Sequence, residues 1–329
     1  MVAVDVVVLT YRPELSLARC VESVVREGNT RVLLAVNNDL ELVAPVLEPL
    51  LARWDAKEVR TLPLGRNWGY AEGLNRALEE VLAAPGAPLV LLLNDDAWLM
   101  PGALDQMVNA AREAGPRTAG IVPKILLGDS DRIDSVGAAI LADGWVANRG
   151  FGDRDEGQYD RVEEVAGACF AAVLVRREAL LEVGSLWSPF FMYAEDADWC
   201  LRARLAGWGF VTCPGAVVRH AHSLSAGTLP TEWKARQIRR NSMLLVVRCF
   251  PPRHALGLTI THIWEDLRGR PAPPGPAATV ASSFFRLLPA ALRERQRIRG
   301  LSSKTAVDAQ LFDDRVFAQS RRPPLSVVG

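Results

Sequence analysis

The chain has 329 residues, of which 49% are hydrophobic, and it carries 38 acidic and 38 basic side chains. This length predicts about two domains, and the apolar content is enough for a full core. Because the net charge is zero, the chain lacks the basic surface on which non-specific nucleic-acid binding depends, so no nucleic-acid partner is expected.

The cysteines and the N-terminus indicate the compartment. The 5 cysteines are odd in number and show no C-x-x-C spacing, which argues against a zinc site or a disulfide framework and favours a reducing compartment. The N-terminal MVAVDVVVLTYRPE enters a strand pattern at once, lacks a basic region and contains Asp5, so no signal peptide is expected. No apolar run approaches the roughly 20 residues that span a bilayer. We therefore expect a cytoplasmic protein.

The first 115 residues alternate between strand and helix patterns. Strands are predicted at residues 4–9, 32–36, 59–64 and 90–93, and helices at 17–25, 47–54, 74–82 and 101–115. Such alternation is typical of a parallel sheet with covering helices. The expected fold class is therefore α/β, with a mostly parallel, Rossmann-like central sheet flanked by helices.

Polar residues follow three of these strands, and the stretch VLLLNDD (residues 90–96) is the most informative. A buried apolar strand runs directly into Asn94, Asp95 and Asp96. In open α/β sheets, ligands bind beyond the carboxyl ends of the strands. Adjacent carboxylates there need a neutralising cation or donor, and oxygen ligands of this kind suit Mg²⁺ or Mn²⁺ shared with substrate phosphates. The alternative is an ordinary turn and helix cap.

Phosphate binding by a glycine-rich loop is not indicated, because neither G-x-G-x-x-G nor G-x-x-x-x-G-K-[ST] occurs. The end of the first strand at Thr10 and Tyr11 and the end of the second at Asn37 should lie beside Asn94 on one edge of the sheet. This clustering again favours a metal that holds a diphosphate.

The second part of the chain is less regular. Residues 119–165 look like short strands and surface loops, which predicts a substrate-facing insertion. A strand is expected at 169–175 and a helix at 177–183, which Gly184 closes. The acidic segment AEDADWCLRARLAG should form a helix that ends at Gly207, and two short strands should follow at 210–213 and 217–220.

Beyond about residue 228 the pattern becomes helical and basic, so we divide the chain into a catalytic domain at 1–228 and a helical extension at 229–329. A proline-rich linker is expected around 271–276. In ASSFFRLLPAALRERQRIRG, apolar residues stand beside five arginines between Arg286 and Arg299. Two readings are open for this segment: peripheral contact with an anionic membrane surface, or packing on the main domain with the arginines toward water.

At this point the order of motifs resembles glycosyltransferase family 2, the inverting GT-A fold enzymes, and especially its rhamnosyltransferase-like and galactofuranosyltransferase-like members. The resemblance covers residues 2–245. Its segments are VVVLTY, GRNWGYAEGLNRAL, LLLNDD, GACFAAVLVRREALLEVG, FFMYAEDADWCLRARLAGW and PGAVVRHAHSLSAG. The long FFMYxEDxDxCLRAR motif is specific, whereas the D-x-D region alone would be weak.

The resemblance implies roles for particular residues. Asp196 would be the catalytic base, at a helix N-terminus whose dipole favours an ionised carboxylate, and Glu195 would orient the acceptor. Asp96 would bind the metal, with Asp95 as a second candidate and His220 as a third ligand, although a satisfied surface histidine is the alternative and His222 lies close by. The simple expectation for Asp198 is a helical ion pair with Arg202.

The resemblance also implies a nucleotide-sugar side of the site, formed by Thr10, Tyr11, Asn37, Asn67, Gly73, Asn75, Asn94 and Asp95. The alternatives are turns at strand ends, packing of Tyr11, and glycines that only shape the loop and helix start. Asn37-Asn38 replaces the Asp-Asn that is usual in the family, so the nucleotide base is left open. Four aromatic residues could stack on a sugar or simply pack: Trp187, Phe190, Phe191 and Trp199.

The sequence thus predicts a metal-dependent inverting glycosyltransferase. It would use Mn²⁺ or Mg²⁺ to move a sugar from a nucleoside diphosphate, with dTDP-rhamnose first and a UDP-sugar second, to a glycan or lipid-linked glycan in polysaccharide or cell-wall assembly. It would act in the cytoplasm or at the inner face of the plasma membrane. The alternatives are a nucleotidyltransferase that makes sugar nucleotides, and a non-catalytic nucleotide-sugar binding module.

Overall fold

The computed structural model describes residues 4–13, 15–140, 146–221, 230–267 and 277–301. Its first part alternates strand and helix, as predicted. In chain order the elements are β1 (Val4–Thr10), α1 (Leu15–Glu27), β2 (Thr30–Val36), α2 (Leu40–Leu51), β3 (Val59–Pro63), α3 (Gly69–Leu82), β4 (Leu89–Asn94), β5 (Ala97–Leu99) and α4 (Ala103–Glu113).

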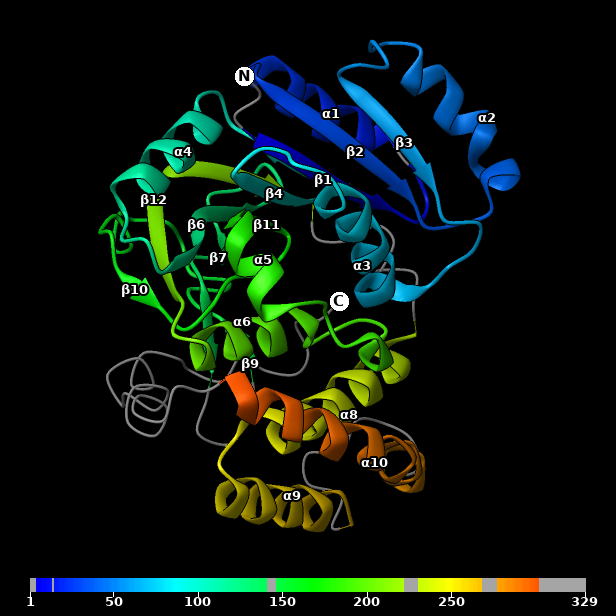
Figure 1. Cartoon of the computed structure of the whole chain (residues 1–329), viewed down its shortest axis with the longest axis vertical. Helices are drawn as coiled ribbons and strands as arrows, with labels where there is room; N and C mark the ends of the chain where they lie inside the picture. The colour runs from blue at the N-terminus through cyan, green and yellow to red at the C-terminus, as the bar shows by residue number, and fades with distance from the viewer. Residues whose placement is uncertain (1–3, 14, 141–145, 222–229, 268–276, 302–329) are drawn as a thin grey trace.

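The second part completes the sheet and adds a helical region. These elements are β6 (Thr118–Leu127), β7 (Ile133–Ser135), β8 (Ala138–Ile140), β9 (Val146–Asn148), β10 (Glu164–Val165), β11 (Ala172–Arg176), α5 (Arg177–Val183), the short 3₁₀ turn η1 (Ser188–Phe190), α6 (Glu195–Leu205), β12 (Gly209–His220), α8 (Thr231–Cys249), α9 (Pro252–Leu267) and α10 (Ala277–Leu301). Figure 1 shows α9 and α10 at the lower end of the molecule, below the sheet.

The central sheet is mixed but mostly parallel, with strand order β10-β12-β6-β11-β4-β1-β2-β3. Strands β1 to β4 run parallel, and β12 runs parallel to β6. Strand β11 is antiparallel to both of its neighbours, β4 and β6. The α/β fold class is therefore confirmed.

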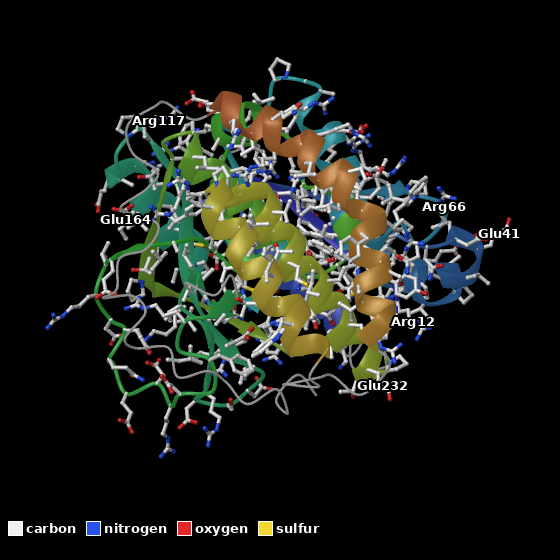
Figure 2. The ribbon with its side chains drawn as sticks, turned by 90° about the horizontal axis from the view of Figure 1, so that it is seen from below. Arg12, Glu41, Arg66, Arg117, Glu164 and Glu232 are labelled. Carbon is white, nitrogen blue, oxygen red and sulfur yellow. The ribbon has the colours of Figure 1, made fainter. Side chains whose placement is uncertain are left out.

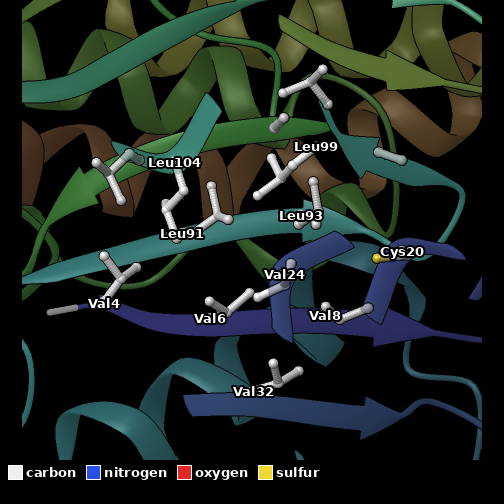
Figure 3. Packing of buried hydrophobic residues seen from close by; sticks show 14 of the residues in the cluster. Val4, Val6, Val8, Cys20, Val24, Val32, Leu91, Leu93, Leu99 and Leu104 are labelled. Carbon is white, nitrogen blue, oxygen red and sulfur yellow. The ribbon is translucent and has the colours of Figure 1, made fainter. Parts of the chain in front are cut away.

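Each face of the sheet is covered by helices, so the core has two halves. Alternate residues of β1 face opposite sides of the sheet, as the two-residue repeat of a strand requires. Val4, Val6 and Val8 pack with α1, α2 and α4, while Val7 and Leu9 pack with α3, α5 and α6. Figure 3 shows the first of these halves.

Two expectations for the sheet were wrong. Residues 118–127 form one long central strand rather than part of an insertion. Pro123 and Lys124 hid this strand because they interrupt its apolar run, yet the buried Lys124 ammonium is neutralised by the carboxylates of Asp155 and Asp160. Residues 209–220 form one strand, β12, instead of two, because an irregularity between Cys213 and Val217 absorbs the interruption.

The helix of the GRNWGYAEGLN motif also starts earlier than expected. It begins at Gly69, so Gly73 and Asn75 lie within α3 instead of in a loop. The side chain of Asn67 accepts a hydrogen bond from the Gly69 N–H at 2.8 Å, which satisfies one of the donors that a helix N-terminus leaves unpaired.

The C-terminal helices are joined to α6 by a buried cluster of charges. The Asp198 carboxylate of α6 is fully buried and pairs with Arg202 at 2.9 Å, as predicted, and with Arg248 of α8 at 2.7 Å. Burial alone would raise the pKa of Asp198, but Arg248 and Arg202 outweigh it and lower that pKa. Apolar residues of α6, α8 and α10 pack around this cluster.

We predict that Asp198→Asn lowers the free energy of unfolding by about 3–5 kcal/mol, because two buried guanidinium groups lose their counter-charge. Chemical denaturation measures this loss. Glu80→Gln is the matched control: it breaks the exposed pair with Arg60, and such pairs contribute about 0–1 kcal/mol. Equal losses in the two variants would contradict the prediction.

Candidate active site

Three polar strand ends meet at one edge of the sheet, as predicted. Asn94 is paired with Leu9 across β4 and β1, and Thr10 is paired with Val36 across β1 and β2. The Asn37 N–H then donates to the Thr10 carbonyl at 2.7 Å. Because the register aligns these ends, the side chains after β1, β2 and β4 share one edge, where an open α/β sheet binds its ligands.

Asp96 and His220 lie side by side next to this edge. Strand β5 pairs antiparallel with β12, with Ala97 opposite His220. This pairing brings His220 Nε2 to 3.0 Å from Asp96 Oδ1, and His220 Nδ1 to 2.7 Å from Asp134 Oδ2. All three side chains are buried. Burial would lower the pKa of His220, but Asp134 and Asp96 together raise it to about 10.

The donor set of this cluster fits a divalent cation that is shared with a substrate. Asp96 offers a carboxylate, and His220 would offer Nε2 after giving up the proton that it shares with Asp96, while Asp134 lies where a second carboxylate orients a metal-binding histidine. Within the described part of the chain, no group of three or more His, Cys, Asp or Glu side chains is arranged to hold a metal ion.

The second acidic group stands at the start of α6. Glu195 and Asp196 occupy its first turn, after Tyr193 and Ala194, which both have a φ of 70°. Non-glycine residues rarely adopt this left-handed conformation, and such strain clusters at functional sites. Asp196 accepts a hydrogen bond from the Ala197 N–H at 2.7 Å, so its carboxylate is held at the positive end of the helix dipole.

Burial makes these two acids weak. It raises the pKa of Glu195 to about 8, with the negative charge of Asp196 as the next cause. Burial also raises the pKa of Asp196, but hydrogen bonds from the Ala197 and Phe170 backbone stabilise that carboxylate and limit the rise. Of the two side chains, Asp196 is therefore the better stabilised in its ionised form.

The acidic start of α6 and the strand edge meet at one backbone segment, Phe170 to Ala171. The Phe170 backbone lies close enough to the Asp196 carboxylate to lower its pKa, and the Ala171 carbonyl accepts from the Asn94 N–H at 2.9 Å. The Tyr70 hydroxyl donates to the Phe170 carbonyl at 3.0 Å. Both sides of the predicted site thus contact the same two residues.

Two buried groups beside this segment respond to both acidic clusters. The pKa of Tyr70 is raised by burial and then by the charges of Glu195, Asp196 and Asp95 among others. The pKa of the Cys169 thiol is raised by burial, then by Asp134 and Asp196. Both acidic clusters are therefore near enough to these buried groups to influence their pKa.

Some predicted nucleotide contacts are already used by the protein. The Asn37 side chain accepts from the Trp68 N–H at 2.9 Å and donates to the Gly69 carbonyl at 3.0 Å. The Asn75 side chain accepts a hydrogen bond from the Leu186 N–H at 2.8 Å and donates one to the Leu186 carbonyl at 2.9 Å. A Cβ on Gly73 would meet the Asn37 amide at 3.0 Å. The geometry gives these three residues a shaping role around the site.

Other buried polar atoms, at the strand edge and at the start of α6, have no hydrogen-bond partner among the described residues. They are Thr10 Oγ1, Asn94 Oδ1, Tyr193 OH and Glu195 Oε2. Leaving such a group unpaired costs about 1–3 kcal/mol, and each unpaired group calls for an explanation. A polar ligand at the strand edge would satisfy them.

Similarity to known proteins identifies the family of this chain. The family model described as "Glycosyltransferase like family 2" matches residues 3–262. The chain belongs to glycosyltransferase family 2. It is 30% identical to the N-acetylglucosaminyl-diphospho-decaprenol L-rhamnosyltransferase of Mycobacterium tuberculosis, over 74% of this chain and 84% of that protein.

Solved structures show the same fold. The structure of GalNAc-T7 with UDP, GalNAc and Mn²⁺ matches with a TM-score of 0.61 at 14% identity, over 86% of this chain and 54% of that one. The mannosyltransferase of Pyrobaculum calidifontis with GDP-Man and Mn²⁺ matches with a TM-score of 0.51 at 14% identity, over 91% and 85% of the two chains. The GT-A fold is thereby shown for this glycosyltransferase.

The structure also gives the glycosyltransferase site residues that the sequence did not reveal. The Asn241 side chain of α8 is buried and donates to the carbonyls of Phe190, Met192 and Tyr193, at 2.7–3.0 Å. It thereby holds the left-handed segment that leads into α6. Asp134 was missed because it lies in an irregular stretch far from His220 in sequence. Neither side chain belongs to a short motif that would have marked it.

The four aromatic residues that could stack on a sugar or simply pack differ in their exposure. Trp187, Phe190 and Trp199 are buried and pack within the core, so they offer no face to a sugar. Phe191 is half-buried and has a φ of 65°. His222 lies outside the described residues.

We predict that Gly69→Ala lowers the kcat/KM of the glycosyltransferase by roughly 100-fold, the cost of a small misplacement near reacting groups. An alanine Cβ at Gly69, where φ is 78°, would stand 2.4 Å from the Phe191 ring and displace the segment before α6. Steady-state kinetics with thermal unfolding measure the effect.

Gly102→Ala provides the control. Gly102 also has a φ of 78°, but a Cβ there meets nothing within 4 Å. Both variants bear a left-handed penalty of about 1–2 kcal/mol, so only Gly69→Ala should lose activity. Equal kinetics in the two variants would refute the steric role of Gly69.

Proposed function

We propose that this glycosyltransferase moves a sugar from a nucleoside diphosphate to a hydroxyl of a lipid-linked glycan in cell-wall or polysaccharide assembly, with inversion at the anomeric carbon. The observation that carries the proposal is the shared segment Phe170 to Ala171, which contacts the acidic start of α6 on one side and the strand edge on the other. A base and a diphosphate site on opposite sides of one sugar are what a single displacement requires.

The relatives support the substrate class. The mycobacterial relative is named as a rhamnosyltransferase that acts on a decaprenol-linked glycan. We therefore take dTDP-rhamnose as the first donor to test and a UDP-sugar as the second, with a polyprenyl-diphosphate-linked glycan as acceptor. With such an acceptor, the reaction is proposed to take place at the inner face of the plasma membrane.

Asp196 is proposed as the general base. In a single displacement, the acceptor oxygen forms a bond to the anomeric carbon while the bond from that carbon to the diphosphate oxygen breaks, and the acceptor proton passes to the base. The Ala197 N–H donates to the Asp196 carboxylate at 2.7 Å and stabilises its ionised form. Its raised pKa makes it a stronger base than an exposed aspartate.

Glu195 is proposed to orient the acceptor. Its carboxyl group is buried and keeps its proton up to about pH 8. A neutral acid can donate one hydrogen bond and accept another, so it can bind a sugar hydroxyl without repelling the charge of Asp196. Glu195 Oε2 has no partner within the described residues, which agrees with a role toward a ligand.

Asp96 and His220 would hold a divalent cation, Mn²⁺ or Mg²⁺, with Asp95 beside them. Mn²⁺ is present in the two solved structures named above. When bound, the cation would stabilise the charge of the departing diphosphate. Asp134 would fix the orientation of the His220 ring through Nδ1.

The nucleotide side of the site is proposed to involve two kinds of residue. Thr10, Tyr11, Asn67 and Asn94 would touch the donor directly. Asn37, Gly73 and Asn75 would support that wall, since their side chains or backbone are packed against other parts of the protein.

Asp196→Asn should abolish transfer and leave donor binding unchanged, because the amide keeps the shape but cannot accept the proton. Released nucleoside diphosphate is measured with Mn²⁺, a panel of sugar nucleotides and a lipid-linked acceptor, and donor binding by calorimetry.

Chelation of the cation should also stop transfer, and added Mn²⁺ should restore it. Release of pyrophosphate would instead indicate a nucleotidyltransferase, and full activity of the variant would remove Asp196 as the base.

The pH profile should separate the two acids. The wild-type kcat/KM should rise with pH as Asp196 loses its proton. It should fall near pH 8, where Glu195 ionises and no longer donates a hydrogen bond to the acceptor. Glu195→Gln is a permanently neutral substitute. It should keep the rising limb, because that limb belongs to Asp196, and lose the change near pH 8. A Gln variant that still changes there would contradict this assignment.

A further inference from the structure

Exposed apolar residues gather on the two last helices that the structure describes. On α9, Leu256, Ile260 and Trp264 have exposed fractions of 65%, 58% and 51%. Their spacing of four residues places them along one face of the helix. On α10, Phe285 and Leu292 are also about half exposed. Large apolar side chains that gather on exposed faces indicate an interaction site rather than chance exposure.

Among the side chains that the structure describes, the exposed charges beside these residues have one sign. Every exposed charged side chain that the structure describes on α9 and α10 is an arginine: Arg253, Arg286, Arg293, Arg297 and Arg299. The described acid on these helices, Glu294, is half-buried and pairs with Arg297. Exposed apolar side chains that are flanked by cationic side chains are the pattern of a helix that lies on an anionic lipid surface.

A second exposed apolar stripe provides a contrast. On α2, Leu42 and Val46 have exposed fractions of 74% and 49%, which resemble those on α9. Here the exposed charged neighbours are Glu41 and Glu48, which an anionic surface would repel. Charge therefore distinguishes the C-terminal helices from α2, although the apolar exposure is alike.

The two helices also lie at one end of the molecule. Figure 1 shows α9 and α10 at the lower end, and Figure 2 shows them in front when the molecule is viewed from below, with Glu41 of α2 at the margin. None of the described helices is long and apolar enough to cross a membrane.

We propose that the exposed faces of α9 and α10 form a docking surface for a bilayer that contains anionic lipids. The arginines attract the lipid headgroups, and the apolar side chains, Leu256 and Ile260 above all, enter the interface. The surface rests on the proposed function in one respect, the lipid-linked acceptor, which docking would bring within reach of α6.

Sedimentation with vesicles tests the surface without any assay of activity. The full chain should pellet with vesicles of phosphatidylcholine and phosphatidylglycerol, remain in solution with phosphatidylcholine alone, and be released by salt. Leu256→Ser/Ile260→Ser should weaken binding by about tenfold or more. Arg286→Gln/Arg293→Gln should weaken it by about fivefold for each arginine.

Leu42→Ser/Val46→Ser is the matched control, and it should bind like the wild type. Equal binding by the two serine variants, or binding that ignores phosphatidylglycerol, would overturn the proposal. So would self-association of the chain without vesicles that Leu256→Ser/Ile260→Ser abolishes, because the face would then serve a second copy. Thermal unfolding confirms that each variant is folded.

Transfer measurements separate this proposal from the proposed function. Leu256→Ser/Ile260→Ser should slow transfer to an acceptor embedded in anionic vesicles and leave transfer to a short-chain, water-soluble acceptor unchanged. Equal slowing with both acceptors would overturn the docking role. A chain that binds vesicles but transfers no sugar would overturn the proposed function and leave the surface standing.

Discussion

The burial of one carboxylate, that of Asp198, is the constraint on which the arrangement of this glycosyltransferase depends. A charge with no exposure to water must be paired, and its partners come from two helices far apart in sequence, Arg202 of α6 and Arg248 of α8. The same contact fixes the helix that begins with the two site acids. The position of the candidate site acids therefore depends on how the C-terminal helices pack.

The three acids of the AEDADW motif show how surroundings set the charge of similar side chains. Asp198, paired with arginines, stays ionised. Burial raises the pKa of both Asp196 and Glu195, but backbone groups limit the rise at Asp196, whereas the pKa of Glu195 reaches about 8. A helix of ordinary composition thus provides an anchor, a base candidate and a neutral acid within four residues.

Much of the fold could be predicted from the sequence, because it depends on local patterns. Apolar runs such as residues 90–93 locate buried strands, and the 3.6-residue repeat of α1 locates its helix. Strand β6 was missed because the charge of Lys124 is neutralised by side chains about 30 residues away, which no local pattern contains. The single long strand β12 was divided for a similar reason, since its irregularity is defined only by pairing with β6.

The candidate site follows the same division. Motifs in the sequence identify Asp96, Asp196 and His220 as candidates. Asp134 and Asn241 were found only in the folded chain, because they contact residues that lie 86 and about 50 positions away in sequence. Amides such as Asn37 and Asn75 remain predicted ligand contacts, and the structure adds the hydrogen bonds that they make within the protein, which a sequence does not show.

The attachment of Asn241 to the carbonyls before α6 has a consequence for engineering. A chimera that exchanges the C-terminal helices with those of a relative would also exchange the clamp on the active-site backbone. The segment from Phe190 through α6 is therefore better exchanged together with α8, as a single cassette.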